Sequence, residues 1–207
     1  MIRKGSTILL LFGLVLLGYV GYQKMIVRQT LSVELEKAKE VVVQAEGSTV
    51  SKKESDKPKS DQTSKKEPDI VFTQGETLGY LTIQTLDMEL PLLEGVDEVT
   101  LAKGVGHHPD TAFPGQGDRI FIAGHNDTTF SKISQLKAGD EVELYLADGS
   151  YRYIMRSSEI VDFTDTRVLE ATGEESLVIS TCYPFYNVTD STERYLIYLE
   201  PVKEELG

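Results

Sequence analysis

The feature that most limits how this chain can fold is an uncharged, apolar stretch near its N-terminus. No residue from Gly5 to Tyr22 carries a charge, and Ile8 to Leu17 is an almost unbroken run of Leu, Ile, Val and Phe with a single glycine. As a helix this stretch is about 27 Å long at about 1.5 Å per residue, close to the roughly 30 Å hydrocarbon core of a bilayer. The sequence therefore predicts a transmembrane anchor over residues 5–23.

The charges next to this stretch indicate its orientation. Arg3 and Lys4 precede it, and basic flanks tend to stay on the cytoplasmic side of a membrane. Residues 1–4 are therefore predicted to be cytoplasmic, with the rest of the chain outside the cell. The alternative is a cleaved signal peptide, which requires small residues at the cleavage site. Residues 23–28 read Gln-Lys-Met-Ile-Val-Arg, a poor match, so an uncleaved anchor is the preferred interpretation.

Two further segments separate the anchor from the rest of the chain. Residues 24–46 alternate charged with apolar side chains, which favours a helical stalk continuing out of the bilayer. Residues 47–69 consist mainly of Ser, Lys, Asp, Glu, Thr and Pro, and such a composition buries too little apolar surface to fold. We expect a flexible charged linker there, and one domain over residues 70–207, since a typical domain takes roughly 100 to 150 residues.

The predicted domain is acidic. From Ile70 onward it has 24 Asp and Glu residues against 9 Lys and Arg, a formal charge of −15. Nucleic-acid binding is disfavoured, because it needs a basic surface. Asp127 and its acidic neighbours could hold a cation, but carboxylates on an acidic surface are usually only solvated, so no metal site is predicted.

Short runs of alternating apolar and polar residues, separated by turn residues, predict a domain of the all-β (mainly β) class. Asp148-Gly149 is typical of a hairpin turn, because glycine tolerates the positive φ that such turns require. We expect at least seven strands in a small closed or partly closed barrel, with one or two short helices. The clearest strand candidates are Tyr80–Ile83, Arg119–Ala123, Glu141–Leu146, Tyr151–Met155, Ser176–Thr181 and Tyr195–Leu199, and the helix candidates are Asp97–Ala102 and Phe130–Leu136.

Three residues that could carry chemistry lie at the ends of predicted strands. Cys182, the only cysteine in the chain, ends an apolar strand; His125 follows another, and Arg194 begins a third. A thiolate becomes a nucleophile when a histidine or a cation lies nearby, and a strand end at a barrel mouth would hold it exposed. Each residue also has an ordinary interpretation: a buried apolar thiol, a turn histidine, and an ion pair of Arg194 with Glu193 or Glu200.

The chain contains five short segments at Gly104–His107, Thr111–Gly115, Ile122–His125, Thr181–Cys182 and Glu193–Tyr195. Their order and spacing resemble those of the sortase family over about residues 75–200. The Thr-Cys-Tyr-Pro-Phe run followed by Glu-Arg-Tyr is most similar to class D sortases. Two departures concern loop shape and subclass: Val178-Ile179-Ser180-Thr181-Cys182 replaces the usual Thr-Leu-x-Thr-Cys, and Asp110 stands where glycine is common.

The resemblance implies an eight-stranded closed barrel and assigns roles to individual residues. Cys182 would be the nucleophile, His125 the general acid and base, and Arg194 the donor to the substrate carbonyl or its oxyanion. Thr181 would support the same oxyanion, and His107 matches a family histidine whose role is structural. No metal or organic cofactor is implied.

The activity implied is a cysteine transpeptidase at the cell membrane of a Gram-positive-type envelope, with its catalytic domain outside. It would cleave an LPXTG-like sorting signal on secreted proteins after Thr and transfer the product to a peptidoglycan-precursor amine. Two alternatives remain open at this point. One is a cysteine endopeptidase, in which water resolves the thioester, and the other is a catalytically silent, anchored barrel that binds wall polymer.

Overall fold

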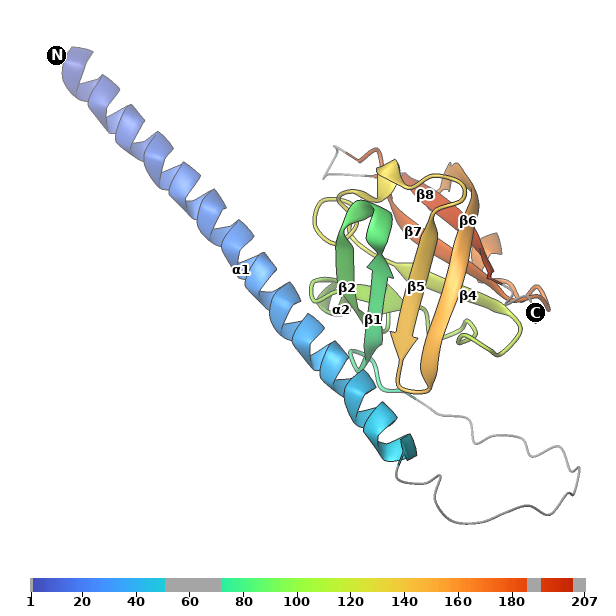
Figure 1. The fold of residues 1–207 in the computed structure, drawn as a ribbon. Helices are drawn as coiled ribbons and strands as arrows, with labels where there is room; N and C mark the ends of the chain where they lie inside the picture. Colours follow the sequence, from blue (N-terminus) through green and yellow to red (C-terminus); the bar gives the residue numbers. More distant parts are fainter. Residues whose placement is uncertain (1, 51–71, 186–190, 203–207) are drawn as a thin grey trace, which may run out of the picture.

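The computed structural model describes residues 2–50, 72–185 and 191–202, which form one long helix and a β-barrel (Figure 1). The two α-helices are α1 (Ile2–Val50) and α2 (Glu98–Leu101), and short 3-10 turns lie at Gln84–Leu86, Ile133–Gln135 and Arg167–Leu169. The strands are β1 (Thr77–Ile83), β2 (Met88–Glu94), β3 (Val105–His107), β4 (Arg119–Ala123), β5 (Glu141–Leu146), β6 (Gly149–Asp162), β7 (Ser176–Tyr183) and β8 (Glu193–Pro201).

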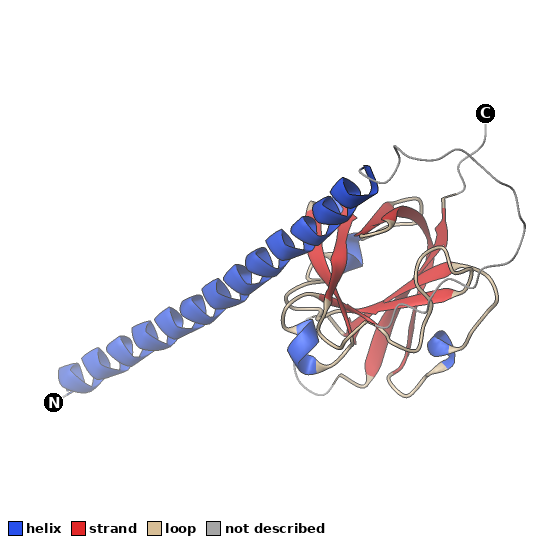
Figure 2. Cartoon of the chain, turned by 90° about the horizontal axis from the view of Figure 1, so that it is seen from below, coloured by secondary structure: helices blue, strands red, loops and turns tan. Residues whose placement is uncertain are grey.

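These eight strands close into a barrel in the order β1-β2-β3-β4-β7-β8-β6-β5, with β5 returning to β1. Two neighbouring pairs, β2 with β3 and β4 with β7, are parallel, and the others are antiparallel. Figure 2 shows the strands as a ring with α1 on its outer side. The predicted closed eight-stranded barrel is confirmed.

Alternation along the strands fills the barrel interior. In β5, Val142, Leu144 and Leu146 are buried while the residues between them are more exposed, as the period of two predicts. They join aliphatic side chains from the other strands in one continuous core. The sequence pattern therefore predicts correctly which face of this strand is inside.

Some elements differ from the sequence predictions. Strand β2 was not predicted, because it is nearly continuous in apolar residues and contains Pro91, which argues against a strand. Its pairing with β3 begins only at Leu92, so the proline removes no donor from that ladder. The helix predicted over Phe130–Leu136 is reduced to a 3-10 turn at Ile133–Gln135. The hairpin turn lies at Ala147–Asp148, one residue before its predicted position, since Leu146 pairs with Gly149.

The helix predicted at Asp97–Ala102 is present as α2, with Asp97 as its N-cap. The Asp97 carboxylate accepts hydrogen bonds from the backbone N–H groups of Val99 and Thr100, at 3.0 and 3.2 Å. A further hydrogen bond from the Thr100 hydroxyl is the main reason that the pKa of Asp97 falls to about 2. The short helix is therefore held at its start by a side chain that stays ionised at neutral pH.

Helix α1 joins the predicted anchor and the predicted stalk in one continuous helix. Among the described residues it is the one helix long and apolar enough to cross a bilayer. It ends at Val50, four residues into the predicted linker, and the remainder of that linker, residues 51–69, lies outside the described residues. Its C-terminal half does not stand free: it packs on β1, β2 and β5, where Ala38 and Val42 are buried.

Candidate active site

The topology brings the three predicted catalytic positions to one edge of the barrel. Strands β4 and β7 are parallel neighbours, with Ala123 opposite Ser180, so the residues that follow β4 lie beside the end of β7. Strand β8 runs antiparallel to β7, and Cys182 lies directly opposite Arg194. His125 follows β4 by two residues. Elements far apart in the sequence therefore meet where Cys182, His125 and Arg194 lie, which we call the active-site edge.

Cys182 and Arg194 lie at strand ends, and their side chains point to the outside of the barrel. Every second side chain of a strand lies on the same face, so Cys182 shares a face with Val178 on β7, and Arg194 shares a face with Leu196 on β8. Those two side chains belong to a small outer cluster with Phe121 and Val168, separate from the barrel core. The candidate site therefore lies on the outer face of β4, β7 and β8, beside the segment that contains Val168.

All three side chains are half-buried, so each is held by its surroundings and still open to solvent. Cys182 is a free thiol. Among the described residues no hydrogen bond or ion pair joins Cys182, His125 and Arg194 to one another. Catalytic hydrogen bonds often tighten only in the complex with substrate, so this arrangement is compatible with a catalytic role for the three residues.

The guanidinium of Arg194 is held by hydrogen bonds to backbone carbonyls of its own loop. One terminal nitrogen, Nη1, donates to the carbonyl oxygens of Ser191 at 3.2 Å and Glu193 at 3.0 Å. The guanidinium carbon lies 5.9 Å from the centre of the Phe163 ring. Glu200, an alternative ion-pair partner considered above, pairs with Arg156 at 2.8 Å. Arginine has five N–H donors, and within the part of the chain that the structure describes the hydrogen bonds of Arg194 use only its Nη1 atom.

The backbone around His125 is fixed by tight packing and hydrogen bonds. A side chain at Gly124 would approach the Phe130 ring to 2.6 Å, so only glycine fits before the histidine. The carbonyl oxygen of His125 accepts the Phe130 N–H at 2.8 Å and the Thr129 hydroxyl at 3.2 Å. The imidazole therefore extends from a rigid turn.

Thr181 is buried and links the strand of Cys182 to the turn of His125. Its hydroxyl donates to the carbonyl oxygen of Gly124 at 2.7 Å. A hydroxyl has one proton to donate, and here that proton is bound to Gly124. In this conformation Thr181 thus connects the two strands, and support of an oxyanion would require this hydrogen bond to break.

The comparisons with known proteins agree with this geometry. Residues 81–202 match the Sortase domain family. The chain is 34% identical to Sortase D of Bacillus subtilis (strain 168) over 90% of this chain and 91% of that protein. The chain belongs to the sortase family.

Solved sortase structures have the same fold. A Sortase D5 transpeptidase of Clostridium perfringens matches with a TM-score of 0.62 and 21% identity, over 83% of this chain and 99% of that chain. A lid mutant of Sortase A from Corynebacterium diphtheriae matches with a TM-score of 0.56 and 26% identity, over 63% of this chain and 72% of that chain. This sortase is therefore a transpeptidase-family enzyme and a homologue of sortase D.

His107 lies on β3 and is almost fully buried. Its Nδ1 atom is 2.8 Å from the Glu94 carboxylate, and its Nε2 atom is 3.0 Å from the carbonyl oxygen of Ala112. The ring stacks on Phe113 with centroids 4.2 Å apart. These contacts join β2, β3 and the following loop, an arrangement suited to the structural role predicted for this residue.

Asn126 is a functional candidate that the sequence reasoning missed. The side chain is buried, and its Nδ2 atom donates to the carbonyl oxygens of Cys182 at 3.0 Å and Pro184 at 3.3 Å. It lies next to His125 in the sequence, so this one residue connects the turn of His125 to the chain at and just after Cys182. In the sequence, the one sign of such a role is that Asn126 directly follows His125.

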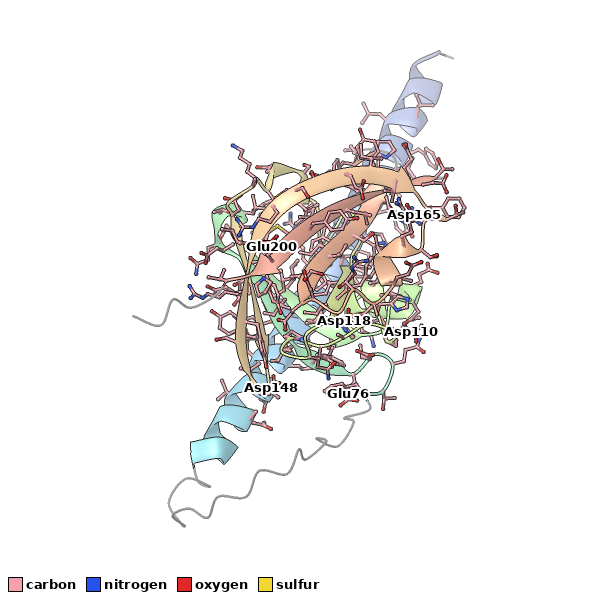
Figure 3. All side chains as sticks on the ribbon, turned by 90° about the vertical axis from the view of Figure 1, so that its right-hand side faces the viewer. Glu76, Asp110, Asp118, Asp148, Asp165 and Glu200 are labelled. Carbon is pink, nitrogen blue, oxygen red and sulfur yellow. The ribbon has the colours of Figure 1, made fainter. Side chains whose placement is uncertain are left out.

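The acidic side chains of this sortase are spread over its surface. Figure 3 shows Glu76, Asp110, Asp118, Asp148, Asp165 and Glu200 well apart on one face of the molecule. Among the described residues, no group of three or more His, Cys, Asp or Glu side chains could hold a metal ion. Asp127 is exposed.

Proposed function

We propose that this sortase cleaves an LPXTG-like sorting signal after Thr and transfers the protein to a peptidoglycan-precursor amine, with Cys182, His125 and Arg194 as its catalytic residues. The observation that carries the proposal is the position of Cys182, directly opposite Arg194 and beside the turn of His125. A nucleophile, a proton carrier and a cationic donor at one edge are what acyl transfer requires.

In the first half of the reaction, the Cys182 thiolate attacks the carbonyl carbon of the Thr residue in the sorting signal. The carbonyl electrons move to oxygen, and N–H donors of Arg194 stabilise the oxyanion. When the oxyanion collapses, the carbon–nitrogen bond breaks, and His125 as imidazolium gives its proton to the leaving amine. A thioester between Cys182 and the sorting signal remains.

In the second half, an acceptor amine attacks the thioester carbon. His125, now neutral, takes the proton that this amine loses, and the carbon–sulfur bond breaks to release the thiolate. A new amide joins the secreted protein to the wall precursor. Thr181 is proposed to hold the strand of Cys182 against the turn of His125, as its hydrogen bond to Gly124 indicates.

We further infer that α1 is an uncleaved anchor that crosses the cell membrane once and places the barrel outside the cell. The uncharged stretch of Gly5 to Tyr22, with Arg3 and Lys4 before it, supports this orientation. Mass spectrometry of the membrane-extracted protein tests it directly. The intact mass of residues 1–207 is expected, and a shortened chain would mean a cleaved leader.

The experiment that tests the reaction uses the full chain in detergent and a Leu-Pro-x-Thr peptide library, with and without an amine nucleophile. We expect the amine to be joined to the peptide after Thr and the hydrolysed product to decrease as the amine concentration rises. Cleavage at an unchanged rate with no amine product would support a cysteine endopeptidase instead. Absence of any cleavage would support the silent wall-binding barrel.

A further inference from the structure

The C-terminal half of α1 presents one apolar stripe to the barrel. Leu31, Leu35, Ala38, Val42 and Ala45 recur at alternating intervals of four and three residues, and all are buried or half-buried. Val33 and Val43, on other sides of the helix, are 55% and 65% exposed. An apolar stripe with this spacing is the packing face of a helix. The stalk is therefore a docked element of the barrel.

Polar and aromatic contacts fix the position of the docked helix. Lys39 Nζ lies 2.8 Å from the Glu89 carboxylate on β2 and 6.0 Å from the centre of the Tyr80 ring on β1. Tyr80 in turn stacks on Tyr145 of β5, with centroids 4.7 Å apart. An exposed ion pair contributes little by itself, but these contacts lie beside the buried Ala38 and Val42, so they set the register of the helix on the three strands.

The strand directions show which end of the barrel faces the N-terminal half of α1. Strands β4 and β7 end at the active-site edge, so the antiparallel β3 begins there. Strand β2 is parallel to β3 and also begins there, and the antiparallel β1 ends there. The linker after α1 leads to the start of β1, which lies at the opposite edge. Figure 1 shows the C-terminal end of α1 beside that opposite edge, with its N-terminus directed to the side of the active-site edge.

We propose that docking of α1 turns the active-site edge of the barrel toward the bilayer, so that the enzyme acts preferentially on sorting signals tethered at the same membrane surface. The inference rests on the proposed function and on the anchor role of α1. A docked barrel meets a tethered substrate at high effective concentration, whereas a barrel on a loose linker samples many orientations.

The orientation is measured without using catalysis. In full-length Cys182→Ala protein reconstituted in liposomes, a fluorophore is placed at Thr85→Cys, on the active-site edge, or at Asp148→Cys, on the opposite edge. Both positions are exposed. We expect stronger energy transfer to a headgroup-labelled lipid from position 85 than from position 148. Equal transfer, or stronger transfer from position 148, would overturn the proposal whether or not the enzyme is a transpeptidase.

Undocking the helix tests the consequence for substrates. Ala38→Glu places a charge in the buried stripe, and Val43→Glu is the matched control on an exposed side of the same helix. In liposomes, Ala38→Glu should lower turnover of a lipid-linked Leu-Pro-x-Thr peptide roughly 10- to 100-fold and leave the soluble peptide unchanged. It should also equalise energy transfer from positions 85 and 148. Equal turnover of the lipid-linked peptide by the two variants contradicts the proposal, as does loss of turnover on both peptides.

A second inference comes from Asn126 and also rests on the proposed function. Its amide donates to the carbonyl oxygens on both sides of Tyr183, immediately after the nucleophile. The structure assigns Asn126 as a positioning residue that holds the chain at Cys182 against the turn of His125. Aspartate has nearly the same shape but no N–H donor, and its charge would face two carbonyl oxygens.

The test compares full-length Asn126→Ala and Asn126→Asp with Thr172→Val, which removes hydroxyl hydrogen bonds to Asp118 and to the Glu174 carbonyl near the starts of β4 and β7, away from the active-site edge. Both Asn126 variants should lower kcat for thioacyl formation between about 10- and 100-fold, with KM changed less than about twofold. Thr172→Val should change mainly the melting temperature. Near-normal kcat in folded Asn126→Ala would overturn the assignment, whereas failure of the unmodified chain to acylate would refute the proposed function.

Discussion

Replacing Cys182 with alanine should abolish both cleavage and transfer while leaving the barrel folded. The thiol is half-buried on the outer face at the end of β7, outside the main core, so its loss removes little packing. No other cysteine exists in the chain to replace it as nucleophile. Circular dichroism and peptide turnover, measured on the same sample, test both parts of this prediction.

Cys182→Ser is the matched control, because it keeps nearly the same volume and a weaker nucleophile. It should fold like the alanine variant and be close to inactive. Turnover retained by either variant would show that another residue forms the intermediate. An unfolded Cys182→Ala protein would show that the side chain has a structural role.

Replacing Arg194 should slow thioacyl formation without unfolding the protein. Loss of an ordinary surface ion pair would change stability by about 0 to 1 kcal/mol and leave turnover nearly unchanged. Loss of an oxyanion donor should lower the rate roughly 10²- to 10³-fold, equivalent to about 2.7 to 4 kcal/mol. Lysine keeps the charge but lacks the planar set of donors, so Arg194→Lys should recover only part of the rate.

We expect the rate of thioacyl formation to be highest in the unmodified enzyme, lower in Arg194→Lys and lowest in Arg194→Ala, while the three melting temperatures stay similar. Single-turnover kinetics on a Leu-Pro-x-Thr peptide measure the acylation step separately from release. Arg156→Ala is a suitable control, since it breaks a surface ion pair with Glu200. Acylation by folded Arg194→Ala at the normal rate would mean that a different residue binds the oxyanion.

Much of the fold could be predicted because strand alternation is a local property. The strand of residues 141–146 is evident from its own six residues, whose alternation sets its inner face. Strand β3 has only three residues, too few to show a period. Strand β2 was hidden by Pro91 and by burial of both its faces, which removes alternation. Local patterns thus predict amphipathic strands and miss short or fully buried ones.

The location of the proposed catalytic residues at strand ends could be predicted, but their surroundings could not. His125 and Cys182 meet because β4 and β7 pair in parallel, a long-range contact with no local signature. Asn126 acquires its role only through that pairing, since its partners lie more than fifty residues away. The outward direction of Cys182 likewise depends on the register of the closed barrel.

The apolar stripe on residues 31–45 lies within the predicted helical stalk of residues 24–46. Its spacing indicates a packing face, yet nothing in the sequence names the surface that covers it. Tyr80, Glu89 and Tyr145 lie on three different strands and become a single docking surface only after β1 has paired with both β2 and β5. A binding surface assembled by sheet pairing is thus not visible in any one segment.

The order of the strands also has a consequence for how the enzyme matures. The site needs β4 beside β7, and β8 beside both β7 and β6, so its parts are joined by contacts of large sequence separation. Such contacts form slowly and late in folding. The strands that carry Cys182 and Arg194 are also the last two strands of the barrel in chain order. Before these strands have paired, Cys182 lies apart from both His125 and Arg194, so the three proposed catalytic residues come together only when the barrel closes.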